Sequence, residues 1–125
     1  MNAEHMKTRT KTFALDVVCL CAELPSAAAL FHIRGQLQRC AASVAANYRA
    51  ACRGRSKPEF IAKLGIVEEE ADESSFWLEF IQDLNVRQHF KLRQRDSLEL
   101  VRLQDEANQL LAIIIASRKT ARGDK

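Results

Sequence analysis

Apolar side chains recur along most of this chain at steps of three and four residues, which is the period of an amphipathic α-helix. The period predicts four helices, over residues 7–24, 26–53, 57–84 and 95–119. Polar residues dominate the stretch 85–94, which we interpret as a loop. Residues 1–6 and 122–125 carry no such pattern and are expected to fray.

Residue types that favour helix ends mark the boundaries between these helices. Pro25 ends the first helix, because the residue before a proline is pushed away from helical angles. Ser26 is the expected N-cap of the second helix, and Gly54 is expected to stop it. Ser56 and Glu59 form a capping box at the start of the third helix.

The lengths of the connections predict how the helices are arranged. About two residues link the second helix to the third, so these two helices must lie antiparallel. Four amphipathic helices with short links predict an all-α fold, an antiparallel up-down-up-down four-helix bundle. A chain of 125 residues is long enough for one core and too short for two, so residues 1–125 are expected to form a single domain.

The third and fourth helices carry more apolar surface than one bundle stripe requires. Trp77, Phe80 and Leu84 form a second ridge on the third helix. Ile113 and Ile115 lie off the main stripe of the fourth helix. These side chains either close the wide end of the bundle or meet another subunit. We expect a homo-oligomer, whose stoichiometry the period does not define.

Charge is strongly segregated along the chain, although its net value is only +3. Residues 26–65 hold seven Arg and Lys against one acid, whereas residues 66–86 hold seven acids and no base. The longest apolar run, residues 110–116, falls far short of the ~20 residues that a membrane span needs. No apolar segment of a signal peptide opens the chain, so we expect a cytoplasmic protein that does not bind membranes.

The residue pattern favours neither a metal site nor catalysis. The cysteines form no C-x-x-C pair and are expected to be small buried thiols: Cys19, Cys21, Cys40 and Cys52. The acidic run 68–73 would need Glu-x-x-His pairs to build a di-iron site, and none of the three histidines stands three residues after a Glu. No Ser or Cys comes with a base and an orienting acid, and no Gly-rich phosphate loop is present. We therefore expect no enzymatic activity, no cofactor and no metal.

Three polar residues are candidates for structural roles between the second and third helices. Asn47 lies on the apolar stripe of the second helix, where a polar group costs stability unless it is hydrogen-bonded. We interpret Asn47 as fixing helix register against Ser74 or Glu70. Glu70 and Glu73 flank the stripe of the third helix and are expected to reach inwards. The acidic run as a whole is interpreted as a solvated face that pairs with arginines of the second helix or of a neighbour.

Five cations surround the predicted turn between the second and third helices: Arg49, Arg53, Arg55, Lys57 and Lys63. Cations near the end of the second helix favour its negative pole, which is a purely structural explanation. The cations in the turn and at the start of the third helix need another explanation, because acids are preferred at a positive helix end. They favour an anion-binding surface. No aromatic residue for base stacking stands between Arg49 and Lys57, so nucleic acid would be held by its phosphates, with a steep dependence on salt.

The residues around this turn also resemble a known family. The segment SVAANYRAACRGRSKPEFIAKLGIVEEEADESSFWLE, residues 43–79, is similar to the 23S rRNA intervening-sequence protein family of small bacterial four-helix-bundle proteins. The positions that match the family pattern are Asn47, Arg55, Ser56, Glu59, Phe60, Glu70, Glu73, Trp77, Leu78 and Glu79. Ala50 departs from it, because a Glu often follows the Tyr-Arg pair, and any ion pair made by that Glu is absent here.

The resemblance implies an antiparallel bundle that assembles as a ring, often a pentamer. It also implies a structural relation to the accessory variability protein of diversity-generating retroelements, a basic toroid that binds nucleic acid and a reverse transcriptase. It assigns no biochemical role. Two hypotheses follow: a homo-oligomer that binds RNA or DNA non-specifically through the basic residues, and a protein-interaction or adaptor module that binds no nucleic acid.

Overall fold

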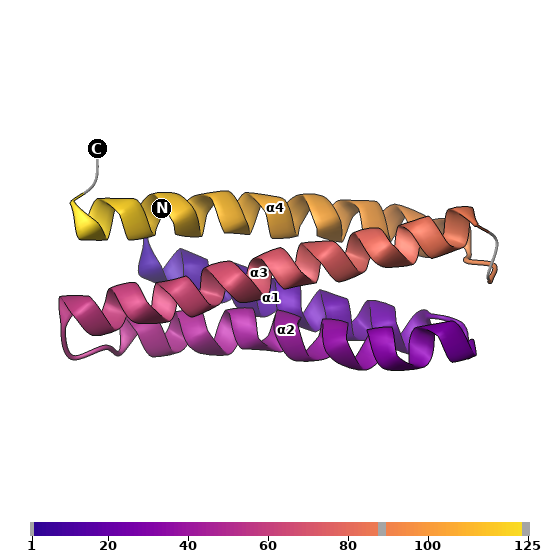
Figure 1. Ribbon diagram of the computed structural model, residues 1–125, viewed down its shortest axis with the longest axis horizontal. Coiled ribbons are helices and arrows are strands. Elements are labelled where there is room, and N and C mark those ends of the chain that lie inside the picture. The colour runs from indigo at the N-terminus through magenta and orange to yellow at the C-terminus, as the bar shows by residue number, and fades with distance from the viewer. Residues whose placement is uncertain (1, 88–89, 124–125) are drawn as a thin grey trace.

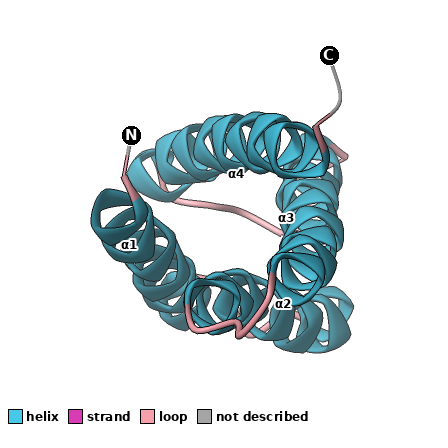
Figure 2. Cartoon of the chain, turned by 90° about the vertical axis from the view of Figure 1, so that its left-hand side faces the viewer, coloured by secondary structure: helices cyan, strands magenta, loops and turns pink. Residues whose placement is uncertain are grey.

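The computed structural model describes residues 2–87 and 90–123, and within these ranges the chain forms four α-helices and no strand. The helices are α1 (Ala3–Glu23), α2 (Ala28–Cys52), α3 (Lys57–Val86) and α4 (Gln94–Arg122). Each helix runs antiparallel to the one before it (Figure 1). Seen from the end, they surround one core in the order α1, α2, α3, α4, and each packs against two neighbours (Figure 2). The predicted antiparallel four-helix bundle is confirmed.

The apolar stripes that the period predicts form the core of the bundle. Each helix contributes side chains with no exposed surface, such as Val17 of α1, Val44 of α2, Leu78 of α3 and Leu110 of α4. Burying one such side chain stabilises the fold by about 1.5–3 kcal/mol. The core is therefore apolar, and almost all charged side chains are directed to the outside of the bundle.

Several helix ends differ from their predictions, most of all the start of α1. α1 begins at Ala3 rather than at residue 7, because Asn2 Oδ1 accepts a 2.7 Å hydrogen bond from the backbone N–H of His5. The expectation that residues 1–6 fray is therefore wrong for the described part of that segment. Ser26 is not the N-cap of α2, since the cap is Ala27 and makes no side-chain hydrogen bond. α4 extends to Arg122, three residues beyond its predicted end.

A short link joins α2 to α3 and determines where the basic residues lie. Gly54 does not adopt the left-handed conformation that its position predicts. It instead permits a close approach, because a Cβ there would lie 3.1 Å from the carbonyl oxygen of Ala51. Ser56 Oγ accepts a 3.2 Å hydrogen bond from the N–H of Glu59, which confirms the predicted cap of α3. The Glu59 carboxylate accepts a 3.0 Å hydrogen bond from the N–H of Arg55 and so tightens the same link.

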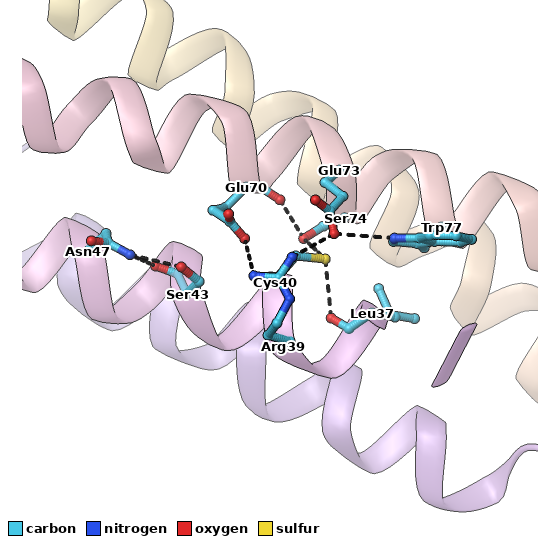
Figure 3. Close-up of polar contacts among 9 residues, drawn as sticks. All are labelled: Leu37, Arg39, Cys40, Ser43, Asn47, Glu70, Glu73, Ser74 and Trp77. Atoms are coloured by element: carbon cyan, nitrogen blue, oxygen red, sulfur yellow. Dashed lines mark hydrogen bonds and ion pairs between the residues drawn. The ribbon is translucent and has the colours of Figure 1, made fainter. Parts of the chain in front are cut away.

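Polar contacts between α2 and α3 run beside the core (Figure 3). Arg39 of α2 donates to Glu73 at 2.8 Å and to Glu70 at 3.4 Å. Further inside, the hydroxyl oxygen of Ser74 lies 3.2 Å from the sulfur of Cys40. Both of these last side chains are buried, so their contact lies between the facing sides of the two helices.

Asn47 does not make the interhelical contact predicted for it. Its side-chain amide donates to the Ser43 carbonyl oxygen at 3.0 Å and to the Ser43 hydroxyl at 2.8 Å, both on its own helix (Figure 3). The prediction of a bond to Ser74 or Glu70 is wrong, because the amide of Asn47 is satisfied one turn back along α2. The buried side-chain contact between the two helices is made by Cys40 and Ser74 instead.

The apolar residues off the main stripes divide between the core and the surface. Trp77, Leu84 and Ile113 are half-buried and pack against the core, so closing the bundle accounts for them. Ile115 is also half-buried. Phe80 retains 38% of its surface exposed and is the member of this group most available to a partner. None of the described helices carries an apolar segment of the length that crossing a bilayer requires.

The cysteines are not all buried as the sequence predicts. Cys19 is exposed and Cys52 is half-buried. Burial raises the pKa of Cys21 and of Cys40 to about 11, so both are uncharged thiols near pH 7.

Arg34 of α2 holds the link between α1 and α2. Its guanidinium donates to the carbonyl oxygen of Cys21 at 2.8 Å and to that of Pro25 at 2.7 Å. α1 has no basic residue in its own last turn. Arg34 therefore supplies, from the neighbouring helix, the positive charge that the negative end of α1 favours.

Replacing Arg34 tests this contact. Arg34→Ala should lower the free energy of unfolding by about 1.5–3 kcal/mol, because charged hydrogen bonds to two carbonyl groups are lost. Arg34→Lys keeps the charge but not the planar two-armed donor, and should fall between Ala and wild type. Urea denaturation measures all three proteins. If the three proteins had the same urea midpoint and the same slope of unfolding free energy against urea, the role of Arg34 would be contradicted.

Gly35 offers a stabilising substitution in α2. It is exposed in the helix interior, and no atom lies within 4 Å of the place where a Cβ would stand. Gly35→Ala should raise the free energy of unfolding by about 0.5–1 kcal/mol, because Gly is a poorer helix former than Ala. Gly65→Ala in α3 is the matched control: its Cβ would stand 3.0 Å from Nη2 of Arg118, so moving that side chain offsets part of the gain. A larger gain at Gly65 than at Gly35 in the same urea experiment would contradict this account.

Candidate nucleic-acid interface

The five predicted cations, here called the basic cluster, lie at the end of the bundle where α2 turns into α3. The basic cluster consists of Arg49, Arg53, Arg55, Lys57 and Lys63. The N-terminus of α1 and the C-terminus of α4 lie at the same end (Figure 1). Figure 2 views the molecule from this end, with the α2–α3 link towards the reader. The short link therefore brings cations from two helices to one end of the molecule.

Three members of the basic cluster line one open hollow of about 500 Å³. Its lining residues are Ala46, Arg49, Ala50, Arg53, Gly54, Glu59 and Lys63. The cations come from both helices, and the three small residues among the lining leave the hollow open. Arg55 and Lys57 do not line it, because they stand in the link and at the first position of α3. The structure thus brings Arg49, Arg53 and Lys63 together and leaves the other two at the side.

The side chains of the basic cluster make no hydrogen bond or ion pair with any described residue. Lys63 is half-buried, and the other four are exposed. Glu59 is the one acid between residues 26 and 65, and its carboxylate accepts from the backbone of Arg55 rather than from a guanidinium or ammonium group. Five cations at this end thus have one neighbouring carboxylate, which lines the hollow but pairs with none of them, so most of the positive charge is uncompensated.

Most other arginines are held by groups of the protein itself. Arg9 forms a two-armed pair with Glu106, with both contacts at 2.7 Å. Arg102 lies 2.9 Å from Asp16 and also pairs with Glu99 on its own helix. Carboxylates likewise pair with Arg39, Arg93, Arg95 and Arg118. Outside the basic cluster, Arg87 is the one described arginine whose side chain makes no such contact.

The acidic run of α3 is partly paired within the chain, and Glu70 and Glu73 make exposed contacts rather than reaching inwards as expected. Glu70 and Glu73 bind Arg39 across the α2–α3 contact, and Glu68 lies 3.7 Å from Arg118 of α4. The interpretation of this run as a face paired with arginines of the second helix is thus confirmed for two of its acids. No group of three or more His, Cys, Asp or Glu within residues 2–87 and 90–123 is placed to hold a metal ion. His89 lies outside the described residues.

Two further cations near this end are not predicted by the sequence reasoning. Lys11 of α1 and Lys119 of α4 are exposed and make no ion pair with a described residue. Lys119 stands in the last turn of α4, which returns to the end that carries the α2–α3 link (Figure 1). The signal for Lys119 was available in the topology, because an up-down-up-down bundle puts the start of its third helix and the end of its fourth at one end.

This arrangement suits an extended anion. Guanidinium and ammonium groups are the usual protein ligands of phosphate, and the former can donate two parallel hydrogen bonds. No aromatic residue lines the hollow, so bases find no stacking platform there. Contacts of this kind hold a nucleic-acid backbone and carry no direct sequence information.

Comparison with known proteins places the chain in a family. No match is found among curated proteins. The chain is similar to the crystal structure of a protein with unknown function from the S23 ribosomal protein family of Bacteroides thetaiotaomicron, with 27% sequence identity and a TM-score of 0.76, over 95% of this chain and 99% of that one. The profile of the 23S rRNA-intervening sequence protein family matches residues 5–114, far beyond the segment 43–79 in which the resemblance is evident by eye. The chain therefore belongs to the 23S rRNA-intervening sequence protein family.

Proposed function

We propose that this protein binds RNA or DNA non-specifically, through contacts between the basic cluster and backbone phosphates. The observation that carries the proposal is the contrast in pairing among the arginines. Those along the flanks of the bundle are bound to carboxylates or carbonyl groups, whereas Arg49, Arg53 and Arg55 have no internal partner among the described residues. Unpaired charges gathered at one end attract a polyanion far more effectively than the same charges paired.

The expected affinity of a single subunit is weak. Binding that depends on phosphate contacts alone has dissociation constants of about 10⁻⁴–10⁻⁶ M at physiological salt. Several copies in one particle would raise the apparent affinity, because a second contact on the same strand forms within one complex. The proposal therefore includes self-association as a ring-like homo-oligomer, with a pentamer as the expected form.

Further parts of the proposal come from the family resemblance and from the residue pattern. The relation to accessory variability proteins of diversity-generating retroelements suggests that a reverse transcriptase or another nucleic-acid enzyme is a candidate protein partner. The protein itself is proposed to have no enzymatic activity and no cofactor, and to act in the cytoplasm without binding membranes.

A protein-interaction or adaptor role is the second candidate, and exposed apolar side chains favour it. Phe31 and Val86 expose 84% and 78% of their surfaces. Large exposed apolar side chains are frequent where another protein binds. In this role the basic cluster would make subunit contacts and would bind no nucleic acid.

A salt series with single-stranded RNA separates the two candidates. For the wild-type protein, fluorescence anisotropy should show an affinity that falls steeply with salt. The double variant Arg53→Ala, Arg55→Ala should bind more weakly, and its plot of log affinity against log salt should be shallower by about 1.4 for each subunit in contact, because two phosphate contacts are lost.

The chain offers a control with the same loss of charge. Arg87 and Lys91 are exposed, make no ion pair with a described residue and lie at the opposite end of the bundle (Figure 1). The double variant Arg87→Ala, Lys91→Ala should keep the wild-type slope. The adaptor role would be favoured if both variants had equal slopes of log affinity against log salt. It would also be favoured if the affinity of the wild-type protein did not change with salt.

Ala50 provides a test that removes no cation. It lines the hollow between Arg49, Arg53 and Lys63, and Arg53 lies three residues further along the same helix face. Ala50→Glu should pair with these cations and weaken RNA binding by on the order of tenfold. Ala50→Gln fills the same space without charge and should bind nearly as well as wild type in the same anisotropy assay. Equal losses in both variants would show that filled space, rather than charge, is the cause.

A further inference from the structure

An open groove lies between α1 and α2, next to the hollow of the basic cluster. Its volume is about 400 Å³, and it shares Ala46 and Arg49 with the hollow. The lining residues are Lys7, Lys11, Ala14, Leu15, Val18, Ala42, Ala45, Ala46 and Arg49. The groove is apolar beyond its cations, because small alanines of α2 and the side chains of Leu15 and Val18, which expose 56% and 43% of their surfaces, line it there. Its charged residues are all cations.

A complementary ridge follows the outer face of α3. Glu69, Asp72, Phe76, Phe80 and Asp83 follow one another at steps of three and four residues and therefore share one side of the helix. Phe76 and Phe80 are exposed, and their ring centroids are 5.8 Å apart. Phe76 also stacks edge-to-face with Trp77 at 4.9 Å. These ring contacts hold the two exposed phenylalanines in place before any partner arrives.

The first two acids of this ridge are unpaired within their own chain. Glu69 and Asp72 are exposed and make no hydrogen bond or ion pair with a described residue. On the groove, Lys11 is equally unpaired. Each surface thus has a charged part followed by an apolar part, and the charges are opposite in sign, which is the kind of match that complementary protein surfaces use.

We propose that the α1–α2 groove receives the α3 ridge of a second copy of this chain. The inference rests on the self-association included in the proposed function and names the surfaces that produce it. Phe76 and Phe80 of one copy lie against Leu15, Val18 and the alanines of the next. Lys11 meets the ridge carboxylates. The lengths agree, since the ridge spans about 21 Å from residue 69 to 83 and the α1 side of the groove about 17 Å from residue 7 to 18, at 1.5 Å per residue.

The contact is head-to-tail, because the groove and the ridge belong to different helices of the same copy. α3 is diagonally opposite α1 in the bundle (Figure 2). Every copy can therefore accept one neighbour and insert into another. Repetition of such a contact gives a closed ring if the rotation between copies closes, and a filament if it does not.

Two variants, each disabling one surface, test the inference. Ala42→Gln with Ala45→Gln fills the groove, and Phe76→Ser with Phe80→Ser removes the apolar part of the ridge. All four changes are at exposed or half-buried positions and alter no charge, and none belongs to the basic cluster. Circular dichroism confirms that both variants remain helical. Light scattering after gel filtration then gives the mass of each protein alone and of an equimolar mixture.

The expected masses follow from the head-to-tail arrangement. Wild type is larger than the 14.1 kDa of one chain, and each variant alone returns to the mass of one chain. The mixture forms a particle of twice 14.1 kDa and nothing larger, because the intact ridge of one variant enters the intact groove of the other and the remaining surfaces are disabled. Variants that keep the wild-type mass, or a mixture that stays at the mass of one chain, would overturn the inference.

The same proteins distinguish this inference from nucleic-acid binding. Both variants keep the basic cluster, so they should still bind RNA, more weakly than wild type because each particle presents one copy. The variant Arg53→Ala, Arg55→Ala should keep the wild-type mass. Loss of assembly with retained RNA binding supports both proposals. If the groove and ridge variants keep the wild-type mass while Arg53→Ala, Arg55→Ala loses RNA binding, the basic cluster is supported and the groove–ridge contact is overturned. If the groove and ridge variants fall to the mass of one chain while no protein, wild type included, binds RNA, the groove–ridge contact is supported and the nucleic-acid proposal is overturned.

Discussion

The tight link between α2 and α3 is the constraint on which the candidate site depends. Gly54 lets the chain pass so close to the end of α2 that a Cβ would stand 3.1 Å from the Ala51 carbonyl oxygen, and the Ser56 cap starts α3 at once. Two helices joined in this way must return along each other, and cations at their adjoining ends must meet. A longer link would let Arg53 and Lys63 move apart. The open hollow, and with it the case for anion binding, follows from the shortness of this connection.

The unpaired state of the basic cluster is a consequence of where the acids lie along α3. Glu70 and Glu73 stand about four turns beyond the start of that helix and are bound to Arg39, which lies at the same level on α2. Glu59 is close enough to the link but neutralises the start of its own helix and a backbone N–H. Side chains cannot reach several turns along a rigid helix. The separation of charge in the sequence therefore survives folding as a separation in space.

Much of the fold could be predicted from the sequence, because helix period and link length depend on local chemistry. The boundaries and core stripes follow from repeating apolar positions, and the cap at Ser56 follows from a short motif.

Contacts that depend on the rotation of one helix against another could not be predicted. Ser74 is a predicted partner of Asn47, yet the structure satisfies Asn47 within α2 and places Ser74 beside Cys40. The clamp by Arg34 was missed for the same reason, since its acceptors belong to the preceding helix. The hollow could be anticipated as a group of cations but not as a shape, because its openness depends on the small side chain of Ala50.

The two proposals support each other through electrostatics. The outer face of α3 carries unpaired acids, and at 0.1 M salt a charge is felt over about 10 Å, so this face would repel a polyanion that approaches along the side of the bundle. Placing the ridge of α3 in the groove of a neighbour covers Glu69 and Asp72 with the cations of α1 and reaches the hollow only at Ala46 and Arg49, so Arg53 and Lys63 stay uncovered. Assembly would then do more than multiply a weak site: it would remove the repulsive part of the surface from the path of the strand. A lone subunit exposes both the basic cluster and the acidic face of α3. It would attract a nucleic-acid strand at the hairpin end and repel the same strand along the side of α3.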